Sequence, residues 1–165
     1  MMHGMLSILS LLVENRPGVL FKVTHMFRSR NFNITSISVG ETSDSNFSRM
    51  TITTNGNEKQ VNQIAKQLDK MIDVIKVEKL DEHSTIYREL ILFKIKISSS
   101  EDNRKINDLA RAYNGTIHAV RKNSIIVEMT ATPEQINAFE NLVKPFGILQ
   151  TARTGMAALL RGNDV

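Results

Sequence analysis

The stretch Asn15-Arg16-Pro17-Gly18-Val19-Leu20 has residue types and spacing that suit the binding of a small anion. Proline favours the first position of a helix, because its missing N–H would be unpaired there and its φ is already helical. Gly18 has no Cβ, so a ligand can approach the free amides of the first turn, where φ should be negative. Those amides and the helix dipole favour a carboxylate. The same residues also suit an ordinary strand-to-helix turn, the commoner outcome for a short motif.

The segments around this turn alternate between strand and helix patterns. Apolar residues recur at helical spacing after the turn, and Asn57 with Gln60 forms a predicted capping box for a second helix. The predicted elements are strands over 5–13, 35–39, 47–54 and 72–80, and helices over 20–27 and 57–71. The order β-α-β-β-α-β predicts a ferredoxin-like unit, an antiparallel sheet with both helices on one face.

The same order repeats after a polar break at residues 81–84. Thr132-Pro133-Glu134-Gln135 combines a cap, a proline and a box glutamine, and is the clearest helix start in the sequence. The predicted strands cover 86–97, 115–121, 124–130 and 146–153, with helices over 106–113 and from 133. We therefore predict an α+β chain of two ferredoxin-like βαββαβ domains in tandem, residues 1–81 and 84–165. An apolar tail at 154–165 is assigned to the second domain.

The first strand has apolar residues on both faces. Leu6, Ile8 and Leu12 lie on the face away from the predicted helices, and something must cover them. A second copy of the chain is the simplest cover, which predicts a homodimer.

Composition narrows the function classes. The chain has 165 residues, 41% hydrophobic and 23% charged, with a net charge of +4 and no cysteine. Disulfides and thiolate chemistry are thereby excluded, and a reducing cytoplasm fits. Charges of both signs are interspersed without a basic run, which disfavours nucleic acid, and no stretch is long enough to suggest a membrane span or signal peptide. The true start is open among Met1, Met2 and Met5.

No residue set has the spacing of a catalytic site. The four histidines lie far apart, and the common nucleotide loops are missing. His25 lies within reach of the Gly18 turn but is far more often structural in such a position. Arg153 and Arg161 could hold an acidic partner or simply be solvated. Acylphosphatases share the topology, but their phosphate loop is absent here.

Six stretches resemble a known family in their order and spacing. Residues 11–20 resemble the opening of ACT domains, which are amino-acid-sensing modules of this topology. Together the six resemble the small, regulatory subunit of acetohydroxyacid synthase (acetolactate synthase), closely over 5–80 and at the tail, loosely over 98–145. The stretches are 11–20, 33–39, 48–52, 63–74, 88–90 and 152–162.

The resemblance implies a cytoplasmic protein that is not an enzyme by itself and holds no cofactor or metal. It would bind the catalytic large subunit, a transferase that carries thiamine diphosphate, magnesium and FAD. It would raise that subunit's activity and mediate feedback inhibition by valine in branched-chain amino-acid biosynthesis. Nucleic-acid and membrane partners are not expected.

The resemblance also places the effector between two ACT domains. By motif, Asn15, Gly18, Val19 and Leu20 come from one subunit, and Asn33 and Ile34 from its partner. The amides around Gly18 would take the effector carboxylate, the two asparagine oxygens its ammonium, and the two aliphatic side chains its branched group. Without the family, Asn33 suits a turn, and Leu20 and Ile34 suit the core.

The alternative is a free-standing ACT-domain sensor that acts on another enzyme or on a transcriptional target. Sequence does not separate valine from leucine or isoleucine, because one methylene in an apolar pocket is worth only about 1–3 kcal/mol. It also leaves open the affinity, the surface that contacts the catalytic subunit and the stoichiometry.

Overall fold

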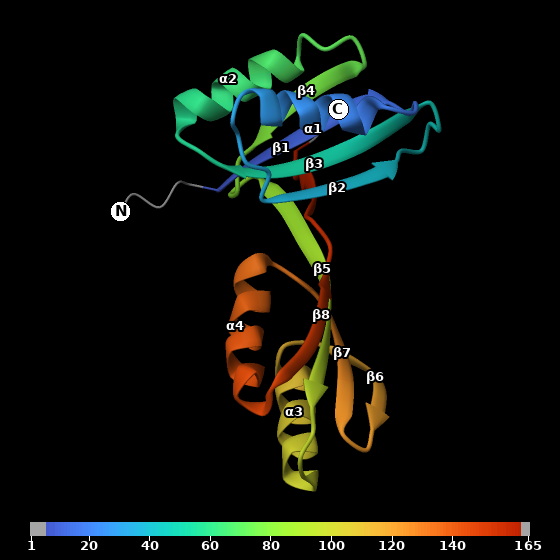
Figure 1. Ribbon diagram of the computed structural model, residues 1–165, viewed down its shortest axis with the longest axis vertical. Helices are drawn as coiled ribbons and strands as arrows, with labels where there is room; N and C mark the ends of the chain where they lie inside the picture. Colours follow the sequence, from blue (N-terminus) through green and yellow to red (C-terminus); the bar gives the residue numbers. More distant parts are fainter. Residues whose placement is uncertain (1–5, 163–165) are drawn as a thin grey trace. The chain divides into compact units, whose positions relative to one another are not determined.

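The computed structural model describes residues 6–162, which form two compact units (Figure 1). Of these residues, unit 1 contains 6–87 and 155–162, and unit 2 is Arg88–Thr154. Both are α+β, with antiparallel strands in the predicted βαββαβ order. Across residues 6–162 there is no helix of the length and apolarity needed to cross a membrane.

Unit 1 contains a four-stranded sheet in the order β2-β3-β1-β4, with α1 and α2 on one face (Figure 1). The alternating residues Leu9, Leu11 and Val13 of β1 face those helices and are fully buried with Val23, Phe27, Ile64 and Leu68. The elements are β1 (Leu6–Glu14), α1 (Val19–Ser29), β2 (Ser36–Glu41), β3 (Phe47–Asn55), α2 (Glu58–Leu68) and β4 (Val74–Leu80).

Unit 2 repeats this arrangement with the strand order β6-β7-β5-β8 and with α3 and α4 on one face (Figure 1). Its core joins Ile91, Phe93 and Ile95 of β5 to Ile106 of α3 and Phe139 of α4. The elements are β5 (Thr85–Lys96, which begins in unit 1), α3 (Ser100–Ala112), β6 (Thr116–Arg121), β7 (Ser124–Ala131), α4 (Pro133–Val143), η1 (Lys144–Phe146) and β8 (Ile148–Arg153).

Local sequence explains where most helices begin. Asn57 caps α2 and Thr132 caps α4, and in both cases the predicted capping box is complete, with a glutamine side chain accepting from the N–H of the cap. Each box satisfies two N–H groups that a helix start otherwise leaves unpaired.

The tail covers part of the second face of the unit 1 sheet. β9 (Ala157–Leu160) pairs with β5, and Met156 and Ala158 cluster with Ile8 and Leu80, so that Ile8 is only 1% exposed. We expected a second copy of the chain to cover this face and assigned the tail to the second domain. Residues 155–162 group with unit 1, and the cover of Ile8 comes from the same chain. The homodimer and the domain bounds stay predictions. An apolar cluster at the end of a sequence does not reveal which surface it will meet.

Candidate functional site

α1 begins directly after a glycine in the left-handed conformation. Gly18 has a φ of +87° and a ψ of −12°, and a Cβ built there would meet no described atom within 4 Å. The Val19 N–H donates to the Arg16 carbonyl at 3.3 Å, which closes the turn just before the helix. Our expectations that Pro17 opens the helix and that φ at Gly18 is negative are therefore wrong. The chain reverses from β1 into α1 through a positive φ, which glycine adopts without steric cost.

Three backbone N–H groups at this helix start are unpaired within residues 6–162. No side chain caps α1, and the N–H groups of Gly18, Leu20 and Phe21 have no acceptor there. The Val19 N–H is already used in the turn, and its side chain is buried in the core at 2% exposure. By contrast, the side chains of Leu20 and Phe21 are 44% and 70% exposed. The turn therefore offers three N–H donors beside an apolar surface.

Asn15 lies just before this turn and fixes its position. Its amide donates to Glu41 Oε1 at 2.8 Å and to the Ser45 carbonyl at 2.9 Å, and its Oδ1 accepts from the Ser48 hydroxyl at 3.0 Å. Both amide protons are thus used to hold the β2–β3 connection. An amide oxygen has two lone pairs, so one remains for an ammonium donor.

Asn33 and Ile34 lie beyond the other end of α1. They line an open hollow of about 390 Å³ together with side chains of the helix, among them Thr24 and Arg28. The Asn33 carbonyl accepts from the Thr54 hydroxyl at 2.6 Å, while its side chain is exposed and makes no hydrogen bond to another described residue. Ile34 is half-buried against the core. A polar amide and an aliphatic side chain therefore meet at one hollow.

The structure does not bring these two groups of residues together within one chain. Gly18 precedes α1 and Asn33 follows it, and the helix has 11 residues. At 1.5 Å per residue it is about 16 Å long, whereas a free amino acid with a four-carbon side chain spans much less. A site made of both groups therefore requires two chains.

An ion-paired cluster that the sequence analysis missed holds the start of α1. Lys22 Nζ lies 2.6 Å from Asp73 Oδ2, Arg16 lies 3.5 Å from Asp73 Oδ1, and Arg16 also pairs with Glu14. The hydrogen bond from Lys22 is the main reason that the pKa of Asp73 is lowered, with burial opposing it and the charges of Lys22 and Arg16 adding to it. No local pattern marks Asp73, because its partners are 51 and 57 residues away.

Comparison with known proteins identifies the family. The model for the AHAS small subunit-like ACT domain matches residues 9–76, and the model for the small subunit of acetolactate synthase matches residues 88–162. The chain belongs to the acetolactate synthase small-subunit family. The acetolactate synthase small subunit of Bacillus subtilis is 39% identical over 158 residues, covering 95% of this chain and 91% of its own length.

Other small subunits agree over similar lengths. The acetolactate synthase small subunit of Mycolicibacterium smegmatis is 36% identical over 154 residues, covering 93% of this chain and 90% of its own. The crystal structure of the small subunit from Thermotoga maritima matches with a TM-score of 0.88 and 36% identity, covering 96% and 99% of the two chains. The tandem fold and the first unit's ACT domain are thus those of this family.

In this acetolactate synthase small-subunit homologue, the remaining candidates from the sequence have ordinary positions. His25 is exposed, with its ring centroid 5.8 Å from that of Phe21. Arg153 donates to the buried Glu89 at 2.6 Å and to Asn137 at 3.2 Å, so its charge is used within unit 2. Arg161 is exposed, and its backbone N–H donates to the Ser84 carbonyl at 2.8 Å.

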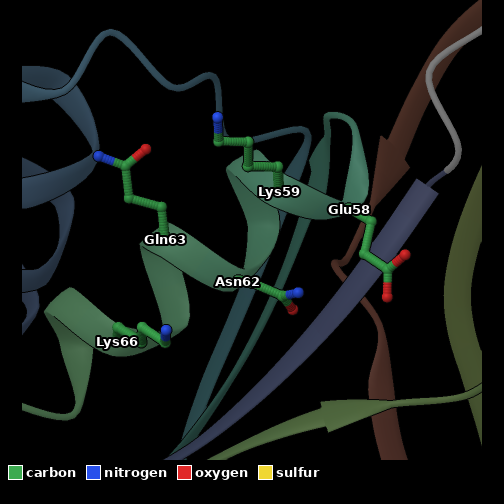
Figure 2. Close-up of a pocket in the computed structure, with 5 residues that line it drawn as sticks. All are labelled: Glu58, Lys59, Asn62, Gln63 and Lys66. Carbon is green, nitrogen blue, oxygen red and sulfur yellow. The ribbon is translucent and has the colours of Figure 1, made fainter.

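A second hollow lies along α2 of the ACT domain and contains none of the predicted site residues. Figure 2 shows its lining, five polar side chains that all project from α2. The hollow measures about 630 Å³, and all five side chains are exposed. They are Glu58, Lys59, Asn62, Gln63 and Lys66. An open polar helix face of this kind does not by itself select a ligand.

Proposed function

We propose that this chain is the regulatory subunit of an acetolactate synthase. It does no chemistry itself, binds a catalytic subunit that carries thiamine diphosphate, magnesium and FAD, raises its activity, and mediates feedback inhibition by valine. Family membership supports the partner, and the match over residues 88–162 favours a subunit over a free-standing sensor. The observation that carries the effector role is the uncapped glycine turn at the start of α1.

The charged side chains around this turn neutralise one another, so the backbone determines which ligand is preferred. Arg16 and Lys22 are paired with Glu14 and Asp73, so the four formal charges cancel. The free N–H groups of Gly18 and Leu20 and the positive end of the helix dipole then supply the preference for a carboxylate. Exposed Leu20 lies beside them and suits a branched aliphatic group.

The complete site is formed by two chains. The Gly18 turn and Asn33 are at opposite ends of α1. In a dimer with a two-fold axis, the Gly18 turn of each chain would face Asn33 of the other chain, which would create two equivalent sites. Asn33 of one chain, with its unpaired side chain, would then accept from the effector ammonium, and Ile34 would line the aliphatic pocket. We therefore expect a homodimer through the ACT domains.

A matched pair of variants tests the carboxylate site. Gly18→Asp and Gly18→Asn have nearly the same shape and share the strain of a positive φ, so they differ mainly in charge. A like charge in a partly desolvated site opposes the effector by on the order of a few kcal/mol, which is about a hundredfold in affinity. The variants are compared in the holoenzyme by valine inhibition and by the activity without valine.

We expect Gly18→Asp to activate the catalytic subunit but to resist valine far more than Gly18→Asn does. Equal responses of the two variants to valine would remove the effector carboxylate from this turn. Loss of activation in both variants would instead place the turn in the contact with the catalytic subunit.

The proposed homodimer is tested separately by measuring the mass of the small subunit in solution. Light scattering of the small subunit at micromolar concentration, with and without valine, should give the mass of two chains. A stable monomer in both conditions would exclude a site built from two ACT domains.

A further inference from the structure

The tail crosses unit 1 at a point that has room only for glycine. A Cβ built on Gly155 would lie 2.7 Å from the carbonyl carbon and oxygen of Ile37, and 3.1 Å from the Ser38 nitrogen. Non-bonded carbon atoms normally stay about 3.5–4.0 Å apart. All these atoms are backbone atoms of β2, so a side chain at this position requires the strand or the tail to shift. The tail backbone therefore rests directly on β2.

The strand under this crossing leads directly to one half of the proposed effector site. Asn33 and Ile34 lie only a few residues before Ile37, and the segment between them is tied to β3. The Thr35 N–H donates to the Thr53 carbonyl at 2.8 Å, and the hydroxyls of Ser36 and Thr53 are 2.6 Å apart. With little slack in this segment, a shift of β2 at Ile37 also moves Asn33 and Ile34.

The residue before Gly155 is tied to unit 2. The Thr154 N–H donates to the Leu90 carbonyl at 2.9 Å, and the Leu90 N–H donates to the Thr154 hydroxyl at 3.0 Å. Arg153 is held by Glu89 and Asn137, and on the other side Met156 is 2% exposed in the unit 1 cluster. Thr154, which is hydrogen-bonded within unit 2, and Gly155, which packs within unit 1, are consecutive residues.

We propose that the crossing at Gly155 couples the effector site to unit 2, with Gly155 as a positioning residue for Asn33 and Ile34. Effector bound at that half-site holds β2 in one position, and β2 holds the tail. Thr154 and Arg153 then pass that constraint to β5 and α4. Coupling of this kind is reciprocal, so a change in the tail also alters effector affinity. The inference rests on the proposed function, because it requires that the ACT domain bind valine.

The test uses the full chain reconstituted with the catalytic subunit. Gly155→Ala is compared with Gly40→Ala, which lies on the same strand but where a Cβ meets no described atom within 4 Å. We expect Gly155→Ala to raise the valine concentration for half-inhibition by about tenfold, a usual size for coupling between sites. Gly40→Ala should change it by no more than about twofold, as surface substitutions do. Activation without valine and the melting temperature are recorded for both.

A second variant separates transmission from binding. Thr154→Val keeps the shape of the side chain but removes the oxygen that accepts from Leu90. We expect valine to bind it with wild-type affinity by calorimetry, and inhibition at saturating valine to be partly lost.

Three results would overturn the coupling. The first is an unchanged valine response in both Gly155→Ala and Thr154→Val. The second is a fall in both the activation and the melting temperature of Gly155→Ala, together with full valine inhibition of Thr154→Val. The crossing would then have only a structural role. The third is a wild-type chain that binds no valine by calorimetry. This result would overturn the proposed effector as well as the coupling, whereas the first two results leave valine binding by the wild type intact.

Discussion

Units 1 and 2 share one topology but begin their helices differently. The strand orders β2-β3-β1-β4 and β6-β7-β5-β8 are equivalent, and each unit has two helices on one face. In unit 2, Ser99 caps α3 and Thr132 caps α4, each through a side-chain oxygen that accepts a backbone N–H. Of the four α-helices in residues 6–162, α1 is the one without a side-chain cap. Unit 2 thus shows that this fold can close the equivalent helix start, so the opening at Gly18 is not a requirement of the topology.

The units also differ on the sheet face away from the helices. In unit 1, the tail packs on that face and buries Ile8 and Leu80. In unit 2, Leu90 and Leu92 on the corresponding face of β5 are each 37% exposed. One sheet therefore has apolar packing on both faces, while the other has its main core on a single face.

Removing the tail should have the largest effect and should act on one unit. Ending the chain after Thr154 exposes Ile8 and Leu80 and removes the buried Met156. Burial of one large apolar side chain contributes about 1.5–3 kcal/mol, so unit 1 should lose roughly 3 kcal/mol or more. Hydrogen exchange should show lower protection in β1 and β3 and unchanged protection in β6 and β7.

Two point variants on the tail serve as its control. Met156→Ala removes a side chain that is 2% exposed just before β9, whereas Leu159→Ala removes one that is 61% exposed within β9. Only the first should lower protection in unit 1. An equal effect of both variants, or a truncation that weakens both units alike, would break the contrast between the two sheets.

The sequence predicted most of the fold, because the strongest signals were local. The capping boxes at Asn57 and Thr132 defined two helices, and alternating apolar residues defined β1 and β5. β9 was not predicted, because four residues with two alanines carry no clear period. The tail's place on unit 1 depends on a surface that includes Ile8 and Leu80, which lie far from the tail in the sequence, and sequence spacing does not show such a contact.

The candidate site was predicted less completely. The open turn follows from the glycine, but the sign of its φ depends on how β1 enters α1, and the residue type alone does not decide it. Asp73 was missed because its partners come from another part of the chain. Asn15 was predicted as an effector ligand, which stays a prediction, and the structure shows that it supports the β2–β3 connection.

Ion pairs stabilise the start of α1, whereas a side-chain cap stabilises the start of α4. Asp73 is 7% exposed and pairs with Lys22, while Thr132 accepts the N–H of Gln135. The hydrogen bond from Lys22, aided by the charges of Lys22 and Arg16 and opposed by burial, lowers the pKa of Asp73 below its ordinary value of 3.8. A lowered folded-state pKa means that the contribution to stability is fully present above the ordinary value. It is lost as the pH falls through the lower, folded-state value.

Asp73→Asn should therefore have the smallest effect, and one that depends on pH. Lys22 and Arg16 are 56% and 60% exposed, so solvent screens the pairs, and we expect a modest fall in the melting temperature of unit 1 at pH 7. The difference from wild type should shrink as the pH falls below about 4, because the wild-type carboxyl then becomes protonated too. Thr132→Ala is the uncharged control, since loss of its cap costs about 1 kcal/mol and involves no titrating group. Its difference from wild type should stay constant over the same pH range. A constant difference for Asp73→Asn as well would show that Asp73 holds α1 through hydrogen-bond geometry alone, and the contrast between a charged and a capped helix start would disappear.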